Sequence, residues 1–340
     1  MDLAKLLGLT LLSLVATGIL IVPFIDFLYK VKLRRQNQKT VDLFNKPTPL
    51  FDKYNKWKVG TPFGGGALII GIVTVLSLWS YGIFDVNASI WEVFVLLFTF
   101  LSFGVLGLYD DIKKLVINPK KYTFFGLRFR HKFILQCALA FFIGLILFFK
   151  LGYSTIFITG IGLIDLGYLY IILATLAIVS FVNAFNITDG LDGLAPGLLL
   201  ISLGAFLAIS SSQLDQTLAI FIAILIGAVA AFLYFNTYKA RIWLGDVGSM
   251  SLGAVLAVIG LLNNKILALV VIGGVFVLEV GSSMIQLLSK KYLKRKIFPV
   301  APFHLLLLKR GWEEPKIVMR AWLFGFFFAI LGLFIATLSK

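Results

Sequence analysis

Apolar runs long enough to cross a lipid bilayer recur along the whole chain of 340 residues. Hydrophobic residues make up 60% of the sequence and charged residues 14%, and the mean hydropathy is +0.99. A run of about 18 or more apolar residues is typical of a transmembrane helix. Only helices and closed barrels satisfy their backbone groups within lipid. Because these runs do not alternate in polarity as barrel strands do, the pattern predicts an all-α polytopic membrane protein.

The hydropathy pattern predicts ten transmembrane helices within one integral-membrane domain that covers residues 1–340. Their approximate bounds are 4–29, 66–84, 91–109, 132–149, 167–186, 196–211, 215–235, 248–262, 266–289 and 319–338. The sixth is short and the eighth and ninth are barely separated, so nine spans and a re-entrant segment are the alternative. Residues 150–166 hold two runs typical of strands and predict a small hairpin.

Basic residues are distributed unequally between the two predicted membrane faces. The net charge is +15, and 27 of the 31 Lys and Arg lie in four segments: 30–58, 113–132, 239–241 and 290–320. Positive residues concentrate in cytoplasmic loops, so the bias predicts an even number of spans with both termini outside. Short basic loops between spans fit a bilayer surface and anionic substrates, and we expect no nucleic-acid partner.

An acidic turn, Asn186-Ile-Thr-Asp189-Gly-Leu-Asp192-Gly193, stands between two apolar runs on the predicted cytoplasmic face. Carboxylates at the end of a membrane helix are costly and indicate a function. The spacing of three residues places Asn186, Asp189 and Asp192 on one face if the segment is helical. Gly190 and Gly193 favour a helix break at which backbone can approach a ligand closely.

Two further cytoplasmic loops carry carboxylates in patterns that favour metal or phosphate chemistry. Asp110 and Asp111 are adjacent at a helix end, where they repel unless a cation such as Mg²⁺ or a shared proton relieves them. A solvated charge cluster is the alternative. Asp246 follows Trp243 by three residues, so a metal ligand and a stacking platform could lie side by side. The alternatives are a helix N-cap for Asp246 and an interfacial anchor for Trp243.

Basic and glycine-rich segments accompany these carboxylates. Lys58 precedes the glycine-rich residues 60–66, which predict either an anion-binding loop or a flexible entry to the second span. The start of the fourth span carries a basic cluster: Arg128, Arg130, His131 and Lys132. The cluster fits the positive-inside bias, and Lys132 could also contact substrate. Glu279 lies within the ninth predicted span and is interpreted as a hydrogen-bonding group at a helix break.

Taken together, five aspartates on one membrane face suit Mg²⁺-dependent phosphoryl chemistry, which needs charge neutralisation and positioning. They are Asp110, Asp111, Asp189, Asp192 and Asp246. Two His and one Cys leave little room for a zinc enzyme.

These motifs resemble a known family. The segments 107–114, 183–195 and 245–249, in this order, are similar to those of the polyprenyl-phosphate N-acetylhexosamine-1-phosphate transferases. Within that superfamily, Lys58-Val-Gly-Thr-Pro62 and the C-terminal residues 301–322 resemble phospho-N-acetylmuramoyl-pentapeptide transferases. The resemblance runs from the first predicted span to the last.

The resemblance implies ten helices with both termini outside and a cytoplasmic active-site cleft in the bacterial plasma membrane. It implies transfer of phospho-N-acetylmuramoyl-pentapeptide from its UDP carrier to undecaprenyl phosphate, giving lipid I and UMP for peptidoglycan synthesis. The resemblance also implies a requirement for Mg²⁺. Members of this family are often homodimers, so a homodimer is expected.

The resemblance further implies roles for individual positions. Asp246 matches the Mg²⁺ ligand, and Asp110 and Asp111 match the catalytic pair that deprotonates or positions the lipid phosphate. The implied substrate-binding positions are Lys58, Leu191, Asp192 and Trp243 at the uridine, Asn186 and Asp189 at the metal and nucleotide, the further polar residues Lys114, Lys132 and Asn236, and His304, the first residue of a histidine motif.

Two segments depart from the family pattern. Phe63 and Gly64 stand where the family has Thr and Met, so a pocket hydroxyl is lost. His304 is followed by Leu305–Leu308, where the family has two more His, then Phe and Glu, which are implied to contact the donor. Three hypotheses therefore remain: lipid I synthesis, a related transferase with another UDP-N-acetylhexosamine donor, and a non-catalytic nucleotide-binding membrane protein.

Overall fold

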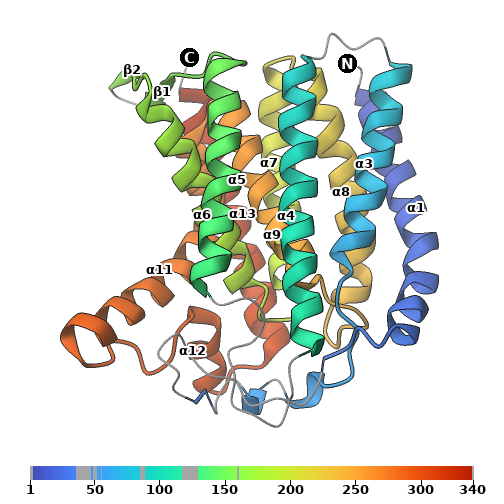
Figure 1. Cartoon of the computed structure of the whole chain (residues 1–340), viewed down its shortest axis with the longest axis vertical. Coiled ribbons are helices and arrows are strands. Elements are labelled where there is room, and N and C mark those ends of the chain that lie inside the picture. The colour runs from blue at the N-terminus through green and yellow to red at the C-terminus, as the bar shows by residue number, and fades with distance from the viewer. Residues whose placement is uncertain are drawn as a thin grey trace.

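A computed structural model describes residues 3–35, 47–48, 52–54, 56–84, 89–116, 129–158 and 161–338 of the chain, so Arg128 of the basic cluster lies outside it. Helices predominate and confirm the all-α prediction (Figure 1). The long helices are α1 (Leu3–Lys30), α3 (Gly66–Ile83), α4 (Ile90–Val116), α5 (Phe129–Phe149), α6 (Leu169–Thr188), α7 (Leu194–Ser212), α8 (Gln216–Asn236), α9 (Gly245–Leu262), α11 (Gly274–Leu288) and α13 (Glu314–Leu338). The short elements are the 3-10 helix η1 (Lys56–Lys58), α10 (Ile266–Ile272), the π-helix η2 (Ser289–Leu293), α12 (Phe303–Lys309) and the strands β1 (Thr155–Ile158) and β2 (Gly162–Asp165).

The predicted membrane spans are present, with one of them divided. Among the described residues, nine helices are long and apolar enough to cross a bilayer, and up to ten spans result if the bent pair α10 and α11 counts as one. This pair occupies the predicted span 266–289, and the chain bends by 78° at the break around Gly273. A Cβ at Gly273 would meet the ring of Phe181 on α6, so glycine allows α6 to pack against the bend. Beyond it, α11 projects sideways from the bundle (Figure 1).

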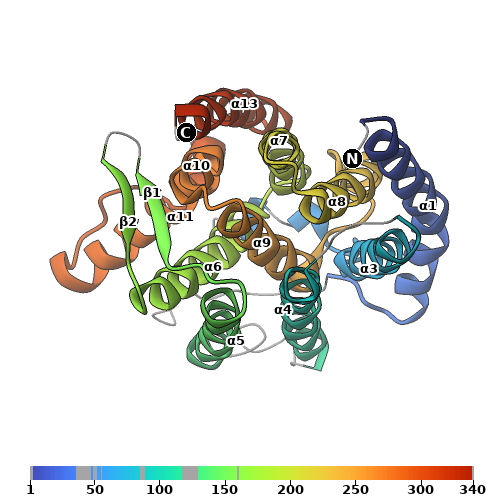
Figure 2. The same ribbon diagram turned by 90° about the horizontal axis from the view of Figure 1, so that it is seen from above.

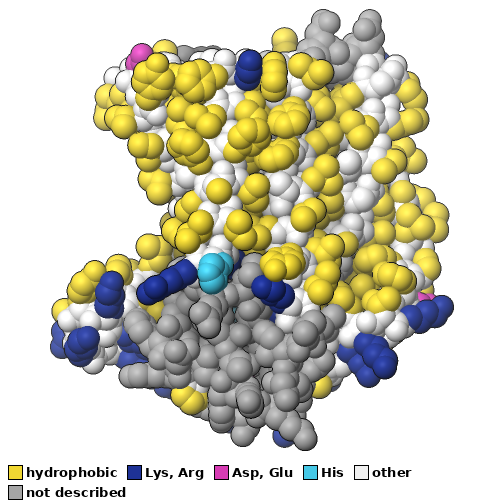
Figure 3. All heavy atoms as spheres, viewed as in Figure 1, with side chains coloured by type: hydrophobic (Ala, Val, Ile, Leu, Met, Phe, Trp, Pro, Cys, Tyr) yellow, Lys and Arg dark blue, Asp and Glu magenta, His cyan; other side chains and the backbone are white. Residues whose placement is uncertain are grey.

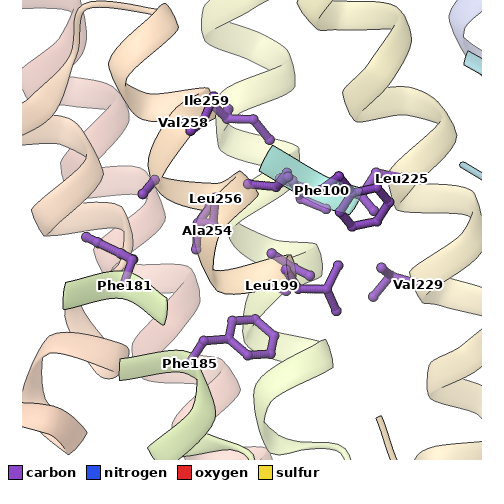
Figure 4. Packing of buried hydrophobic residues seen from close by; sticks show 14 of the residues in the cluster. Phe100, Phe181, Phe185, Leu199, Leu225, Val229, Ala254, Leu256, Val258 and Ile259 are labelled. Atoms are coloured by element: carbon purple, nitrogen blue, oxygen red, sulfur yellow. The ribbon is translucent and has the colours of Figure 1, made fainter. Parts of the chain in front are cut away.

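Helix α9 occupies the centre of the bundle (Figure 2). Helices α3, α4, α6, α7 and α10 contact it, and its residues from Val247 to Leu262 are all buried. Apolar side chains from neighbouring helices pack around it (Figure 4): Phe100, Phe181, Phe185, Leu199, Leu225 and Val229. Lipid tails are as apolar as these side chains, so close packing rather than exclusion of water holds membrane helices together.

Two glycine contacts bring neighbouring helices close to the start of α9. Gly66 on α3 lies against Gly248, and Gly107 on α4 lies against the main-chain carbonyl of Asp246. In both places a Cβ would overlap backbone atoms of α9, so only glycine permits this approach. The first turn of α9, which carries Asp246, is therefore clamped between α3 and α4.

The two ends of the bundle differ in what they carry. The described chain ends and the hairpin lie at one end, and α12 and η1 lie at the other, which we call the site end (Figure 1). The hairpin was predicted, and its strands are antiparallel with Thr155 opposite Asp165. Hydrophobic side chains cover the middle of the bundle, whereas Lys and Arg gather towards the site end (Figure 3). This separation of apolar and basic surface is typical of a protein embedded in a bilayer.

Candidate active site

Three helix termini meet at the site end and bring five charged residues together. The last turns of α4 supply three of them, α5 supplies one near its start, and α9 supplies one in its first turn. We call them the aspartate–lysine cluster: Asp110, Asp111, Lys114, Lys132 and Asp246. Each was a predicted site residue. Four lie in loops or helix ends that were predicted to face the same side of the membrane, and Lys132 lies at the start of the fourth predicted span.

Asp246 contacts both lysines of this cluster. Its Oδ2 lies 2.6 Å from Lys132 Nζ, and its Oδ1 lies 2.8 Å from Lys114 Nζ. Asn186, at the end of α6, donates a hydrogen bond from Nδ2 to Asp246 Oδ1 at 3.2 Å and another to Ser249 Oγ at 2.7 Å. Two ammonium groups and one carboxamide therefore favour the ionised form of Asp246.

Asp110 and Asp111 are both almost completely buried, and each is paired with lysine. Asp111 Oδ1 lies 3.1 Å from Lys114 Nζ, and its Oδ2 accepts a hydrogen bond from the Val247 N–H at 3.0 Å. Asp110 Oδ2 lies 3.3 Å from Lys132 Nζ. Buried carboxylates are tolerated when cations and N–H groups satisfy them. The adjacent aspartates are thus relieved by lysines, and the alternative of a solvated charge cluster is wrong.

A second group of charges lies around Lys58 and forms what we call the Lys58 cluster. Lys58 Nζ lies 3.0 Å from Asp192 Oδ1 and 2.8 Å from Glu314 Oε1, and all three side chains are buried. Trp243 donates from Nε1 to Asp192 Oδ1 at 3.2 Å. The Ala240 N–H donates to Asp192 Oδ2 at 2.8 Å. Asp192 is therefore fixed at both of its oxygens.

The turn after α6 is fixed at Gly193 by hydrogen bonds to two neighbouring segments. Gly193 has φ of +78°, a left-handed conformation that glycine adopts without strain. Its N–H donates to Asn236 Oδ1 at 3.0 Å, and its carbonyl accepts from Trp322 Nε1 at 3.2 Å. Asn236 also donates from Nδ2 to the Ile242 carbonyl at 2.8 Å. The predicted site residue Asn236 thus links the turn, through hydrogen bonds, to the segment that precedes Trp243.

Asp189 lies at the beginning of this turn, electrostatically close to both clusters. Desolvation by the surrounding protein raises the pKa of Asp189 well above its usual range, the Asp246 carboxylate adds to that increase, and Lys58 opposes it. Within the described part of the chain, no hydrogen bond or ion pair reaches the Asp189 carboxyl group. Its side chain is partly exposed, so it can receive a cation or a donor group.

His304, on α12, lies against the same turn. A Cβ built on Gly190 would come within 2.5 Å of His304 Nε2. Glu279 on α11 holds the other side of the imidazole, with its Oε2 3.0 Å from Nδ1, and also accepts from the His304 N–H at 3.1 Å. Glu279 therefore has the hydrogen-bonding role beyond the helix break that its position predicted. Within the departing segment, Leu305 and Leu306 are buried.

Two sequence-based interpretations change in the light of these contacts, and the third, for Trp243, gains cationic neighbours. The glycine-rich loop is no open anion site, because Gly64 and Gly65 both donate their N–H groups to the Trp243 carbonyl. The Leu191 side chain is buried in the apolar core, which leaves only its backbone to meet a ligand. Trp243 is partly exposed but has cationic neighbours, with Lys58 Nζ 5.4 Å and Arg35 Cζ 5.2 Å from its ring. Burial lowers the pKa of Arg35 to about 10, so its guanidinium stays protonated at neutral pH.

The residues that sequence reasoning missed are partners of predicted ones. Glu314 joins the Lys58 cluster, Ser249 accepts from Asn186, and Arg35 lies over Trp243. Glu314 follows another glutamate at a helix start, and nothing in the local pattern separates the two. Its pairing with Lys58 spans 256 positions of the chain, so only the tertiary structure reveals it.

Comparison with known proteins identifies the group to which this chain is similar. Residues 93–264 match the model of glycosyl transferase family 4. A phospho-N-acetylmuramoyl-pentapeptide-transferase of Geobacillus thermodenitrificans is 36% identical over 328 residues, which cover 95% of both chains. The enzyme of the same name from Halalkalibacterium halodurans is 36% identical over 98% of both chains. That from Desulfotalea psychrophila is 41% identical over 83% of this chain and 81% of its own.

The similarity covers 95% and 98% of two of these relatives and 81% of the third, and it includes the segments that form both clusters. The matched region 93–264 contains every member of the aspartate–lysine cluster, the turn after α6 and Trp243. The chain therefore belongs to the phospho-N-acetylmuramoyl-pentapeptide transferase family, a group of membrane-embedded phosphoglycosyl transferases.

Proposed function

We propose that this protein transfers phospho-N-acetylmuramoyl-pentapeptide from its UDP carrier to undecaprenyl phosphate, giving lipid I and UMP. A phosphate oxygen of the lipid forms a new bond to the β-phosphorus of the donor. The bond from that phosphorus to the bridging oxygen breaks, and this oxygen leaves on UMP with its electron pair. The observation that carries the proposal is the aspartate–lysine cluster at the end of membrane helices. The chain that holds it is similar over nearly its full length to phospho-N-acetylmuramoyl-pentapeptide transferases.

The aspartate–lysine cluster supplies charge and position for this reaction. Lys114 and Lys132 carry two positive charges at a place where three phosphate groups would meet. Such preorganised charge stabilises a phosphoryl transition state without covalent participation by the protein. Asp110 lies beside Lys132 and is the group that we assign to positioning of the lipid phosphate. Asp246 lies between two ammonium groups, and we assign it to binding rather than to proton abstraction.

Magnesium is the cofactor that we propose for this site, with Asp246 and Asp189 as the carboxylates that would hold it. No group of three or more Asp, Glu, His or Cys among the described residues is arranged to hold a metal by itself. That donor set fits Mg²⁺, which typically binds one or two carboxylates together with water and substrate phosphate oxygens. When bound, the ion would neutralise charge on the diphosphate.

The Lys58 cluster is the part of the site that we assign to the uridine nucleotide. Trp243 presents a partly exposed indole on which a base can stack, and Asp192 fixes that indole through its N–H. The two clusters are bridged by Asp189, whose electrostatic neighbours include both Lys58 and Asp246. A donor that spans from base to diphosphate can therefore contact both clusters at once.

We also propose that the site end faces the cytoplasm. Lys and Arg gather towards this end and the described chain ends lie at the other (Figures 1 and 3). The positive-inside bias supports this orientation, in which the UDP-linked donor would come from the cytoplasm and the lipid acceptor from the surrounding bilayer. A homodimer remains a prediction from the family resemblance.

The proposal is tested by UMP release from purified protein in lipid nanodiscs. The reaction would contain UDP-N-acetylmuramoyl-pentapeptide and undecaprenyl phosphate, with and without Mg²⁺. We expect UMP and lipid I in equal amounts, both requiring Mg²⁺ and both lost in Asp246→Asn. Absence of Mg²⁺-dependent UMP release from a protein with a cooperative thermal transition would contradict the proposal.

A different donor is the second candidate, because α12 carries one histidine followed by leucines. The side chains of Leu305 and Leu306 are apolar and cannot hydrogen-bond a diphosphate, so His304 is the polar side chain that α12 places against the turn. The assay should therefore be repeated with UDP-N-acetylglucosamine and with UDP-N-acetylmuramic acid lacking the peptide. Higher kcat/KM for either sugar would replace the proposed donor, whereas UDP-sugar binding without turnover would favour the non-catalytic hypothesis.

A further inference from the structure

Glu314 is a buried carboxylate that the proposed reaction does not use. It is the first residue of α13, and its side chain is only 8% exposed. One oxygen, Oε1, makes two contacts: Lys58 Nζ at 2.8 Å and the Asp192 N–H at 2.7 Å. A carboxylate loses much of its hydration on burial, so contacts to a cation and an N–H are what make this position tolerable.

These contacts place Glu314 next to Lys58 and Asp192, in the part of the site that we assign to the nucleotide. Lys58 also pairs with Asp192 Oδ1, which in turn accepts from Trp243 Nε1. A continuous chain of polar contacts therefore runs from Glu314 through Lys58 and Asp192 to the indole. Groups that share partners in this way are energetically coupled, because displacement of one alters the geometry of the others.

Helix α13 contacts the same turn at a second point. Trp322, two turns further along α13, donates from Nε1 to the Gly193 carbonyl, and a Cβ at Gly197 would overlap its ring. Glu314 and Trp322 thus fix consecutive residues of the turn, Asp192 by its N–H and Gly193 by its carbonyl. Trp322 acts through shape and one hydrogen bond, whereas Glu314 also sets the charge balance around Lys58.

We propose that Glu314 is a positioning residue for the uridine nucleotide part of the donor. It holds the Lys58 ammonium against Asp192 and so fixes the orientation of the Trp243 indole. The inference rests on the proposed function, which assigns the Lys58 cluster to the uridine nucleotide. Loss of the Glu314 charge leaves Lys58 with one carboxylate partner, so the pocket loses its fixed geometry while the aspartate–lysine cluster keeps its contacts.

The test compares Glu314→Gln with its matched control Glu313→Gln. Gln keeps an acceptor for the Asp192 N–H and removes only the charge, and Glu313 is an exposed neighbour that loses the same charge. For Glu314→Gln we expect KM for the UDP-linked donor to rise about tenfold, the size that loss of one charge-assisted contact gives. The values of kcat and of KM for undecaprenyl phosphate should stay within about twofold of wild type. Glu313→Gln should match the wild-type protein in all three.

UMP binding, measured by calorimetry on the full chain in nanodiscs, separates this inference from the proposed function. Weaker UMP binding in Glu314→Gln supports the positioning role even if the wild-type protein shows no turnover. Unchanged donor KM and unchanged UMP affinity in a folded Glu314→Gln would overturn it, whatever the reaction. A fall in kcat with both KM values unchanged would also overturn it, because a purely structural role predicts that pattern.

If Glu314→Gln does not fold, Glu314→Asp provides the second variant, because it keeps the charge and withdraws it by one methylene. We expect its UMP affinity to fall by about threefold to tenfold. Wild-type affinity in Glu314→Asp, together with wild-type donor KM, would overturn the inference.

Discussion

Lys132 and Asp246 are 114 positions apart in the chain, and their side chains meet with Lys132 Nζ 2.6 Å from Asp246 Oδ2. The same ammonium group lies 3.3 Å from Asp110 Oδ2. Lys132 therefore joins α5 to both α4 and α9 at the level of the proposed chemistry. Its removal should affect catalysis more than it affects the apolar packing of the bundle.

Lys132→Gln should lower kcat for UMP release by about 100-fold, the usual effect of removing one preorganised electrostatic group. Among the described residues, Asp110 and Asp246 would then keep an ion pair with Lys114. Arg130→Gln is the control, because Arg130 is an exposed cation two residues earlier on the same helix. A Lys132→Gln protein with wild-type kcat would show that this ammonium group has no part in the reaction.

Residue spacing and the charge bias were enough to predict that aspartates from separate segments would gather at one end of the bundle. Asp110, Asp189 and Asp246 each lie where an apolar run ends or begins, and positive-inside counting assigned these positions to one face. The partners of these groups could not be predicted, because they depend on side chains brought together from distant helices. Glu313 and Glu314 show this most clearly: adjacent and identical in type, one is exposed and the other completes a buried cluster.

The position of the bend at Gly273 escaped prediction for a related reason. Hydropathy continues across residues 266–289, so the pattern leaves one span or a re-entrant segment open and does not locate the break. The break is favoured instead by the contact between Gly273 and the ring of Phe181, which belongs to a helix almost 100 residues earlier in the chain. In the same way, sequence shows that Gly64 and Gly65 carry N–H groups, but only the fold shows that Trp243 accepts both.

Gly107→Ala should disturb the site through the backbone of Asp246. The new Cβ would overlap the Asp246 carbonyl, so α4 and the start of α9 must separate. We expect the free energy of unfolding to fall by about 1–3 kcal/mol, as for other overpacked positions, and activity to fall further than stability alone explains. Thermal unfolding in detergent and UMP release would measure the two effects.

Gly71→Ala is the matched control for Gly107→Ala. Gly71 also lies within a long membrane helix, and its Cβ would meet no atom within 4 Å. Alanine there should leave activity unchanged and should not lower stability, since alanine is the better helix former. If both alanine variants behave alike, the close approach of α4 to Asp246 is not important for the site.

Glu279 and His304 should be energetically coupled. Glu279 Oε2 lies 3.0 Å from His304 Nδ1 in a buried contact between α11 and α12. In a double-mutant cycle with Glu279→Gln and His304→Asn, we expect a coupling free energy of about 0.5–3 kcal/mol in thermal or denaturant unfolding. A coupling of zero would show that the imidazole is held by its packing against Gly190 and not by this carboxylate.

The stability of the protein should depend on pH through Asp189. Because the folded protein raises the pKa of Asp189, the stabilising contribution of its protonated carboxyl is complete below the unfolded value of about 3.9. That contribution is lost as the pH rises through the higher pKa that Asp189 has in the folded protein, because the ionised carboxylate is then repelled by Asp246. Asp189→Asn should flatten this part of the pH profile of the melting temperature.

The same shift predicts how Mg²⁺ should act on the wild-type protein. A cation held by Asp189 and Asp246 favours the ionised carboxyl, so its binding releases a proton and strengthens as the pH rises. We expect Mg²⁺ to raise the melting temperature more at about pH 8 than at about pH 5, by mass action on the folded state. Ca²⁺ and K⁺ at matched ionic strength provide the controls. An equal Mg²⁺ effect at both pH values, or one that persists undiminished in Asp189→Asn, would remove Asp189 from the proposed metal site.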